Sequence, residues 1–237
     1  MIFAMILAHL VGDYVLQWDS LAIRKSKDLT GALTHGTIVT VVTVLFATLV
    51  APAWWPWAIG IGLIHTLIDA GWLLNKSLPP ERQLVPLARF VIDQILHAVT
   101  ILAALVLSGY TDMVGLPNTM VAEVQHYPTI ALLAGYVLIS MPAWVLVEFL
   151  VYGLVRAPTA DFSPSANKYL GIVERGLITT FVLLGQFALV PLVAVPRLVF
   201  EGPRVINSQR TTPYLTEILM SVALAVAIGL ALRLIVQ

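Results

Sequence analysis

Cysteine is absent from the 237-residue sequence, and charged residues are scarce. Without cysteine the chain has no disulfide, thiolate metal site or cysteine nucleophile, so any metal ion would have to be held by His, Asp or Glu. Only 11% of the residues are charged and 59% are hydrophobic, whereas about 25% are charged in a typical soluble domain. The 13 basic and 13 acidic residues cancel, which leaves no basic surface for nucleic acid. We therefore expect a polytopic membrane protein whose partners are membrane lipids.

Long apolar runs indicate the fold class. A helix needs about 20 apolar residues to cross the hydrocarbon core of a bilayer. The runs are predicted to be helices, because a backbone in lipid must satisfy its own hydrogen bonds. The prediction is an all-α, polytopic transmembrane bundle of about seven helices. These helices are expected at residues 2–18, 31–51, 56–74, 86–110, 129–155, 170–196 and 213–235.

The distribution of Lys and Arg predicts how the chain is oriented. Basic residues occur in the connectors after the first, third and fifth runs, and none occurs in the connectors after the second and fourth. The positive-inside rule then places the N-terminus outside and the C-terminus in the cytoplasm. Arg197, Arg204 and Arg210, after the sixth run, oppose this orientation. Either the sixth run, which contains Gly185, is re-entrant, or the segment after it lies along the membrane as a basic amphipathic piece.

Pairs of a His and an Asp four residues apart interrupt the apolar runs. They are His9 with Asp13, His65 with Asp69, and Asp93 with His97. A spacing of four places both side chains of a pair on one helix face. The third pair has the reverse order and lies on a helix expected to run the other way. At a rise of about 1.5 Å per residue, its Asp and His therefore fall at the same two depths as those of the other pairs. His35 falls near the level of the carboxylates.

Ionisable groups at membrane depth are unfavourable, at ~2.5 to 3.5 kcal/mol for Asp on insertion scales, and they persist where they face one another, a cavity or a metal. A lone intramembrane His more often makes a packing hydrogen bond than binds a metal. The group of pairs favours one or two divalent transition-metal ions, Zn, Mn or Fe, as cofactor. The predicted ligands are His9, Asp13, His35, His65, Asp69, Asp93 and His97.

Other polar residues are given secondary roles. Glu148 and Glu174, near the ends of the fifth and sixth runs, are the candidate catalytic residues for proton transfer. Glu174 is also expected to pair with its neighbour Arg175. Lys25 is interpreted as a charge that sets topology. Gln94 either orients a ligand or joins two helices.

The motif helices resemble a known family. Leu7 to Gln17, the His35 helix, Ile64 to Asp69 and Phe90 to His97 are similar to a multi-pass bacterial inner-membrane family, a domain of unknown function with "AHLxGDxxLQ", "HxxxD" and "DQxxH" helices. The resemblance covers about residues 1–110, and Gly171 to Arg175 resemble a helix start in longer members. It implies the bacterial inner membrane and no established activity. We divide the chain into a half that carries the His/Asp site, residues 1–110, and a three-helix half, residues 111–237.

Several functions are compatible with these features. The leading hypothesis is a metal-dependent hydrolase that acts on a lipid-borne or amphipathic substrate from the cytoplasmic side, where the metal activates a water molecule. An analogy with membrane-embedded metal-dependent hydrolases supports it only at the level of fold. A divalent metal or proton-coupled transporter is the alternative, although no polar pathway continues into the outer halves of the first four runs. A structural metal or polar cluster, and bis-His haem binding, are further alternatives.

Overall fold

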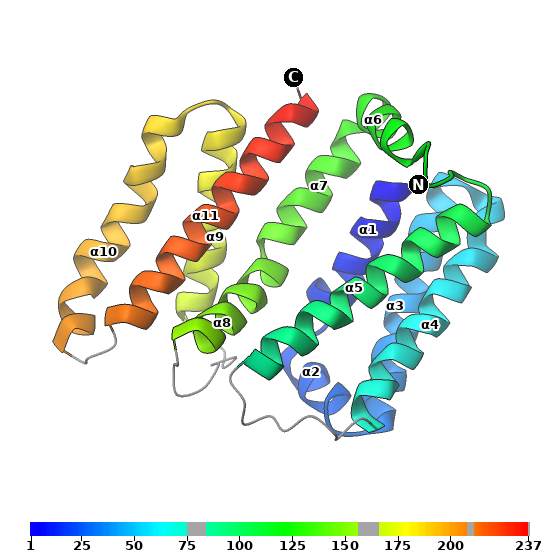
Figure 1. Ribbon diagram of the computed structural model, residues 1–237, viewed down its shortest axis with the longest axis horizontal. Helices are drawn as coiled ribbons and strands as arrows, with labels where there is room; N and C mark the ends of the chain where they lie inside the picture. The colour runs from blue at the N-terminus through cyan, green and yellow to red at the C-terminus, as the bar shows by residue number, and fades with distance from the viewer. Residues whose placement is uncertain (75–83, 156–165, 208–210, 237) are drawn as a thin grey trace. The chain divides into compact units, whose positions relative to one another are not determined.

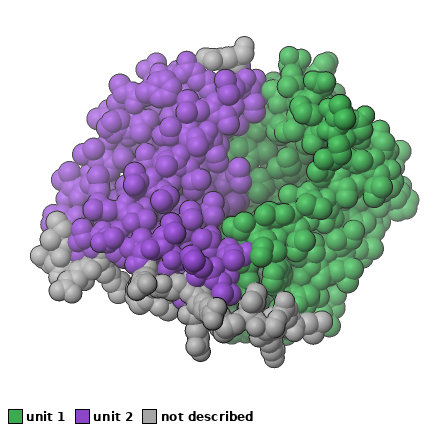
Figure 2. Space-filling view, viewed as in Figure 1, with its two compact units in different colours: residues 1–79, 89–137 green, residues 80–88, 138–237 purple. Residues whose placement is uncertain are grey.

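The computed structural model describes residues 1–74, 84–155, 166–207 and 211–236 (Figure 1). Within these ranges the chain is almost wholly helical and forms the eleven α-helices α1 to α11, so the prediction of an all-α bundle is confirmed. The chain forms two compact units (Figure 2). Unit 1 contains residues 1–79 and 89–137, and unit 2 contains residues 80–88 and 138–237.

Unit 1 contains the helices on which the His and Asp motifs lie. α1 (Ile2–Leu10) continues into a π-helical turn, η1 (Val11–Val15), and is followed by the short helix α2 (Asp19–Lys25). The long helices α3 (Leu29–Val50) and α4 (Trp55–Leu74) are joined by the 3-10 turn η2 (Pro52–Trp54). Then follow α5 (Leu84–Leu107), α6 (Leu116–His126) and α7 (Pro128–Ile139). α5 and α7 each begin or end with a few residues that belong to unit 2.

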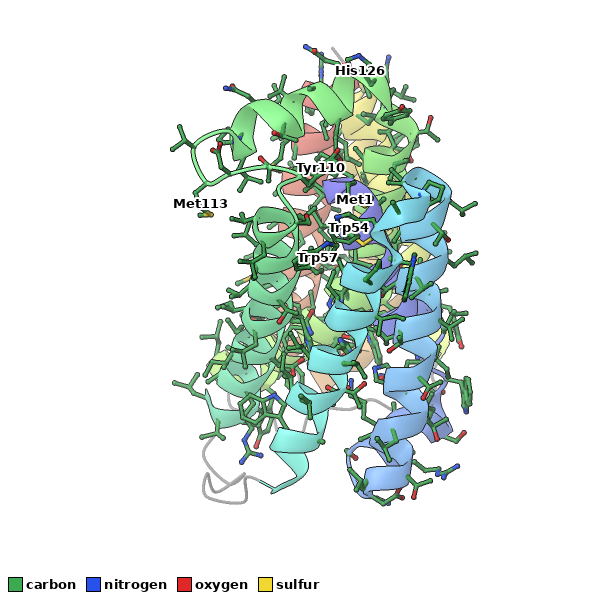
Figure 3. The ribbon with its side chains drawn as sticks, turned by 90° about the vertical axis from the view of Figure 1, so that its right-hand side faces the viewer. Met1, Trp54, Trp57, Tyr110, Met113 and His126 are labelled. Carbon is green, nitrogen blue, oxygen red and sulfur yellow. The ribbon has the colours of Figure 1, made fainter. Side chains whose placement is uncertain are left out.

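The first turn of α1 is held by Glu123 of α6. The Glu123 carboxylate accepts hydrogen bonds from the backbone N–H groups of Ile2 (2.8 Å) and Phe3 (3.1 Å), and from the Tyr110 hydroxyl (2.7 Å). The Met1 amino group lies 2.6 Å from the same carboxylate, and Figure 3 shows Met1 and Tyr110 close together. Burial raises the pKa of Glu123, but these hydrogen bonds outweigh burial and hold the pKa below its ordinary value. Glu123 therefore satisfies backbone groups that a helix start leaves unpaired.

Unit 2 contains α8 (Met141–Val155), α9 (Ala166–Leu183), α10 (Val190–Asn207) and α11 (Thr211–Val236). The single sixth helix expected over residues 170–196 is wrong, because the chain reverses direction within that range. Gly185 has a φ of +74°, a left-handed conformation that ends α9, and the 3-10 turn η3 (Phe187–Leu189) then leads into α10. Figure 1 shows α9 and α10 running in opposite directions from this turn. The reversal agrees with the re-entrant alternative and places Arg197 on a returning helix rather than in a loop.

The apolar helices are consistent with a membrane protein. In the described part of the chain, four helical stretches are long and apolar enough to cross a bilayer, and Ile2–Val15 is a shorter apolar helix. The four stretches are Leu29–Val50, Leu84–Leu107, Pro128–Val155 and Thr211–Val236. These five pieces correspond to the first, second, fourth, fifth and seventh of the predicted runs. Side chains such as Val41, Leu45 and Leu49 of α3 are exposed on the protein surface, as expected for helices that face lipid.

Candidate metal centre

Six of the seven predicted ligands converge in unit 1 at a point where η1 and α3 to α5 meet. They form three overlapping groups in which one ligand atom per residue lies within 4.8 Å of the others. The groups are His9, Asp13 and His97; Asp13, His35 and His65; and His65, Asp69 and His97. The sequence places these residues up to 88 positions apart, from His9 to His97. Each of the three motifs therefore contributes a His to one place in unit 1.

Three of these side chains have the spacing of ligands around one small ion. His35 Nε2 lies 3.3 Å from His65 Nε2, and Asp69 Oδ2 lies 3.4 Å from His65 Nε2 and 3.6 Å from His35 Nε2. Ligand atoms at 2.0 to 2.1 Å from a tetrahedral Zn²⁺ are separated by roughly 3.3 to 3.4 Å. Asp13 Oδ1 lies 2.9 Å from His35 Nε2 and is the natural fourth donor. The triangle of His35, His65 and Asp69 therefore fits a tetrahedral ion with little rearrangement.

The remaining members of the cluster are His9 and His97. Their rings are 5.1 Å apart, and the His97 ring stacks on the His65 ring at 4.1 Å. Both ring nitrogens of His97 are buried without a hydrogen-bond partner. A buried polar atom without a partner is unfavourable by roughly 1 to 3 kcal/mol, so a polar group brought to His97, from a substrate or an ion, would offset this unfavourable free energy. The donor set of imidazoles and carboxylates suits Zn²⁺, Mn²⁺ or Fe²⁺.

Two glycine–threonine contacts bring α3 and α4 close enough for His35 and His65 to meet. A Cβ at Gly36 would lie 2.8 Å from Thr66 Cβ, and a Cβ at Gly62 would lie 2.6 Å from Thr40 Cβ. The Thr40 and Thr66 hydroxyls donate to backbone carbonyls of their own helices, at Gly36 (2.7 Å) and Gly62 (2.8 Å). Small residues that allow close backbone approach are typical of helix pairs in membranes. His35 directly precedes Gly36, and His65 directly precedes Thr66, so the Gly36–Thr66 contact lies beside both rings.

The π-helical turn η1 carries Asp13 into the cluster. The turn is closed by a hydrogen bond from the Leu16 N–H to the Val11 carbonyl at 2.9 Å, a spacing of five residues. Single π turns inside α-helices are often found at functional sites. Gly12 lies against α3, where an added Cβ would be 3.1 Å from Val39 Cα. Asp13 is thereby held beside His35, with its Oδ2 3.9 Å from His9 Nε2.

Lys25 is part of the site, a role that its interpretation as a topology charge did not include. Its Nζ lies 3.1 Å from Asp13 Oδ1 and 3.1 Å from Asp69 Oδ2. Burial lowers the pKa of Lys25, but these two carboxylates outweigh burial and raise the pKa above its ordinary value. No spacing rule links a residue at the end of α2 to α1 and α4, and its place depends on the tight corner between α2 and α3. At that corner a Cβ on Gly31 would lie 2.6 Å from the Lys25 backbone nitrogen, and Asp28 caps α3 by accepting from the Gly31 N–H at 2.6 Å.

Asp93 lies beside the cluster and belongs to none of the three groups. Its Oδ1 accepts a hydrogen bond from Trp72 Nε1 at 2.8 Å, and its Oδ2 accepts one from Gln94 Nε2 at 3.0 Å. The same Oδ2 is 3.5 Å from His97 Nδ1. A carboxylate against the far nitrogen of a His is the arrangement that fixes the ring orientation of metal-binding histidines. Gln94 also contacts His9, with Oε1 3.4 Å from Nε2, so it connects Asp93 to a second His.

The two candidate catalytic residues lie in unit 2. Glu174 is on α9 and forms an ion pair with Arg197 of α10, with Oε2 3.3 Å from Nη1. The expected pairing of Glu174 with Arg175 is therefore wrong. Arg175 instead donates to the Ile139 carbonyl (2.9 Å) and to Ser221 Oγ (3.1 Å). Glu148 is half-buried on α8, and the catalytic role of both glutamates stays a prediction.

An apolar cavity of about 270 Å³ lies between α1, α5 and α6 and reaches the cluster. Its lining is apolar except for His9 and Gln94. The side chain of His9 is 12% exposed, whereas those of His35, His65 and His97 are exposed by 2% or less. His9 is thus the part of the cluster that faces open space. His126, the fifth His, lies at the outer end of α6 (Figure 3), where it is exposed and contacts the Ala122 carbonyl at 2.8 Å.

Comparison with known proteins gives one match. A family model described as "Protein of unknown function (DUF3307)" matches residues 1–127. This range contains every His and Asp of the cluster, together with Lys25 and all residues that line the cavity. The resemblance drawn from the motif helices is therefore confirmed. No curated protein and no solved structure matches the chain.

Proposed function

Since the chain belongs to the DUF3307 family of proteins of unknown function, its activity has to be inferred from its site, and we propose that it is a membrane-embedded, metal-dependent hydrolase of a lipid-borne or amphipathic substrate. The observation that carries this proposal is the His35–His65–Asp69 triangle, with its tetrahedral spacing, beside an apolar cavity that ends at His9. A buried cluster that reaches an apolar cavity suits a substrate that is itself dissolved in the membrane.

Charge favours a single divalent ion. Asp13, Asp69 and Asp93 contribute three negative charges, and Lys25 contributes one positive charge within 3.1 Å of two of them. The formal charge of these four groups is −2, so one divalent ion neutralises it. Two ions would leave an uncompensated positive charge in an apolar bundle, which is strongly unfavourable. We propose Asp13, His35, His65 and Asp69 as the ligands, with His9 and His97 facing the substrate side.

When bound, a divalent ion would polarise a phosphoryl or carbonyl oxygen and make a coordinated water more acidic. The chain's own residues have separate tasks. Asp93, whose Oδ2 lies 3.5 Å from His97 Nδ1, orients the His97 ring. Gln94 fixes His9 at the end of the cavity, where His9 can accept or donate a proton at the reacting group.

Cation transport is the second candidate, because the Lys25 ammonium already occupies the position of a cation between two carboxylates. Buried ionisable chains of this kind also occur in transporters. The apolar lining of the cavity beside His9 weighs against an ion pathway on that side. We further propose a bacterial inner-membrane location with the N-terminus outside. A reporter fused after Gln237 that is active only outside the cell would contradict the orientation.

The first experiment is elemental analysis of protein purified without a His tag or chelator. We expect about one equivalent of Zn, Mn or Fe per chain, and a higher melting temperature when that metal is added. Less than about a tenth of an equivalent, with no such stabilisation, would rule out the metal site. Asp69→Ala and His65→Ala should each lower the metal content, whereas His126→Ala, which changes an exposed His on α6, should not.

Hydrolase and transporter are then separated in sealed liposomes that contain the metal-loaded protein. Turnover of a lipid phosphate or ester that is lost in Asp69→Ala, without metal flux, supports the hydrolase. Metal flux that requires Asp69, without turnover of any lipid, supports the transporter and contradicts the hydrolase.

A further inference from the structure

The cavity between α1, α5 and α6 has one polar end and one apolar end. On α1 its lining residues recur at helical spacing, from Ile2 through Ile6 to His9. On α5 they recur in the opposite direction, from Leu105 through Ile101 to Gln94. His9 and Gln94 lie 3.4 Å apart and close the polar end, next to the cluster. At the other end Leu116 and Met120 of α6 complete an apolar lining.

The dimensions of the cavity suit a single chain. Seven residues of helix separate Ile2 from His9, which corresponds to a length of roughly 10 Å. The volume of about 270 Å³ is nearly twice that of an engineered apolar cavity of about 150 Å³ that binds benzene. A space of this volume and length can take one short hydrocarbon chain, whereas a two-chain lipid would need a much larger site.

We propose that this cavity binds the hydrocarbon chain of a single-chain amphiphile, with the polar head of the amphiphile at His9 and Gln94. The proposal deepens the proposed function, on which it rests for the identity of the reacting group. An apolar chain is stabilised there because its surface leaves water and contacts aliphatic side chains. The head group can accept a hydrogen bond from the His9 ring or from Gln94, and it then lies at the edge of the His/Asp cluster. The cavity thus selects substrates by their chain and presents the head to the cluster.

Photolabelling tests this assignment in the full-length protein reconstituted into nanodiscs of saturated phosphatidylcholine. The probe is lysophosphatidic acid with a diazirine near the end of its acyl chain. We expect the label on the residues of α5 and α6 that line the cavity, such as Leu102 and Met120. Label spread evenly over exposed apolar residues of other helices, such as Leu49 of α3, would overturn the proposal.

A matched pair of variants on α5 checks the position of the chain. Ala98 and Ala103 are both exposed residues of this helix, but only Ala98 lines the cavity. Ala98→Phe should fill the space and lower the labelling of Leu102 and Met120 at least about tenfold. Ala103→Phe should leave the labelling unchanged. Equal labelling in both variants would contradict the cavity assignment.

Competition on the unmodified protein gives an answer even if Ala98→Phe fails to fold. Unlabelled lysophosphatidic acid should abolish labelling, whereas glycerol phosphate, which has the same head and no chain, should not. If glycerol phosphate competes equally well, the chain is not what the cavity recognises and the proposal is wrong. Specific labelling in a protein that holds no metal supports the chain site while ruling out the metal-dependent hydrolase. Metal binding without specific labelling rules out the hydrocarbon-chain site but supports the metal centre.

Discussion

Replacement of Lys25 by Met should make the site bind metal more tightly. The Lys25 ammonium lies 3.1 Å from Asp13 Oδ1 and 3.1 Å from Asp69 Oδ2, the same oxygens that we assign to the ion. Two unit charges at that distance interact by roughly 5 kcal/mol at an effective dielectric constant of about 20. Most of this interaction energy is recovered when the displaced ammonium is solvated or shares the carboxylates with the ion. We expect a net gain of about 1.4 to 2.8 kcal/mol, or roughly tenfold to a hundredfold in affinity, in Lys25→Met.

The assay is chelator competition with Zn²⁺ or Mn²⁺ on protein in nanodiscs. Lys27→Met is the matched control, because Lys27 is exposed in the turn that follows α2. The metal-free Lys25→Met protein should also melt at a lower temperature, since two buried carboxylates lose their shared partner. Removal of the charge should further allow a second ion to bind at high metal concentration. Unchanged or weaker metal affinity in Lys25→Met would refute the competition between ammonium and ion, and with it the charge balance that favours one ion.

Three further changes test the supports of the site. Asp93→Asn should lower turnover by the metal-loaded protein by about 10-fold to 100-fold, because the His97 ring on the substrate side loses the carboxylate 3.5 Å from its Nδ1; unchanged turnover would show that Asp93 has no such part. Gly36→Ala should destabilise the protein by about 1 to 3 kcal/mol through overpacking against Thr66, measured as a lower melting temperature. Gly60→Ala should have little effect, because no neighbouring atom lies within 4 Å of the added Cβ. Folding lowers the pKa of Glu123. The stabilisation that the Glu123 carboxylate provides is therefore complete above its pKa in the unfolded chain, about 4.3, and is lost as the pH falls through its lower pKa in the folded protein. Glu123→Gln should therefore melt at a lower temperature near neutral pH and show less additional loss in acid.

That the His and Asp motifs would lie close together could be predicted, because their spacing and order place them at related levels along their helices. Each apolar run fixes a helix, and counting residues from its end gives a level. The reversed order of Asp93 and His97 on α5 was therefore informative before any contact was known. Counting residues along a helix does not show how the helix is rotated about its axis or how far it lies from its neighbours. Asp93 lies one turn from His97 on α5, and nevertheless accepts a hydrogen bond from Trp72 and belongs to none of the three groups.

The contacts of Lys25 were missed and the α9–α10 reversal was left as one of two alternatives, for different physical reasons. Lys25 reaches the cluster because a short helix turns back over the start of α3, and the length of that turn leaves no periodic signal in the sequence. The reversal depends on one residue, Gly185, in a run that is apolar on both sides and therefore resembles a continuous span. The ion pairs of Arg197 with Glu174, Glu201 and Glu217 follow from that reversal and likewise required the structure.

The shortness of the first apolar helix has a consequence for how Asp13 can lie inside an apolar bundle. Ile2–Val15 spans 14 residues and therefore roughly 21 Å, whereas the hydrocarbon core of a bilayer is about 30 Å thick. Residues 1–14 are buried or half-buried, so other helices surround this short helix. A helix covered in this way does not have to match the thickness of the bilayer. Its end can therefore hold the Asp13 carboxylate within the protein, where Lys25 and His35 rather than water are its partners.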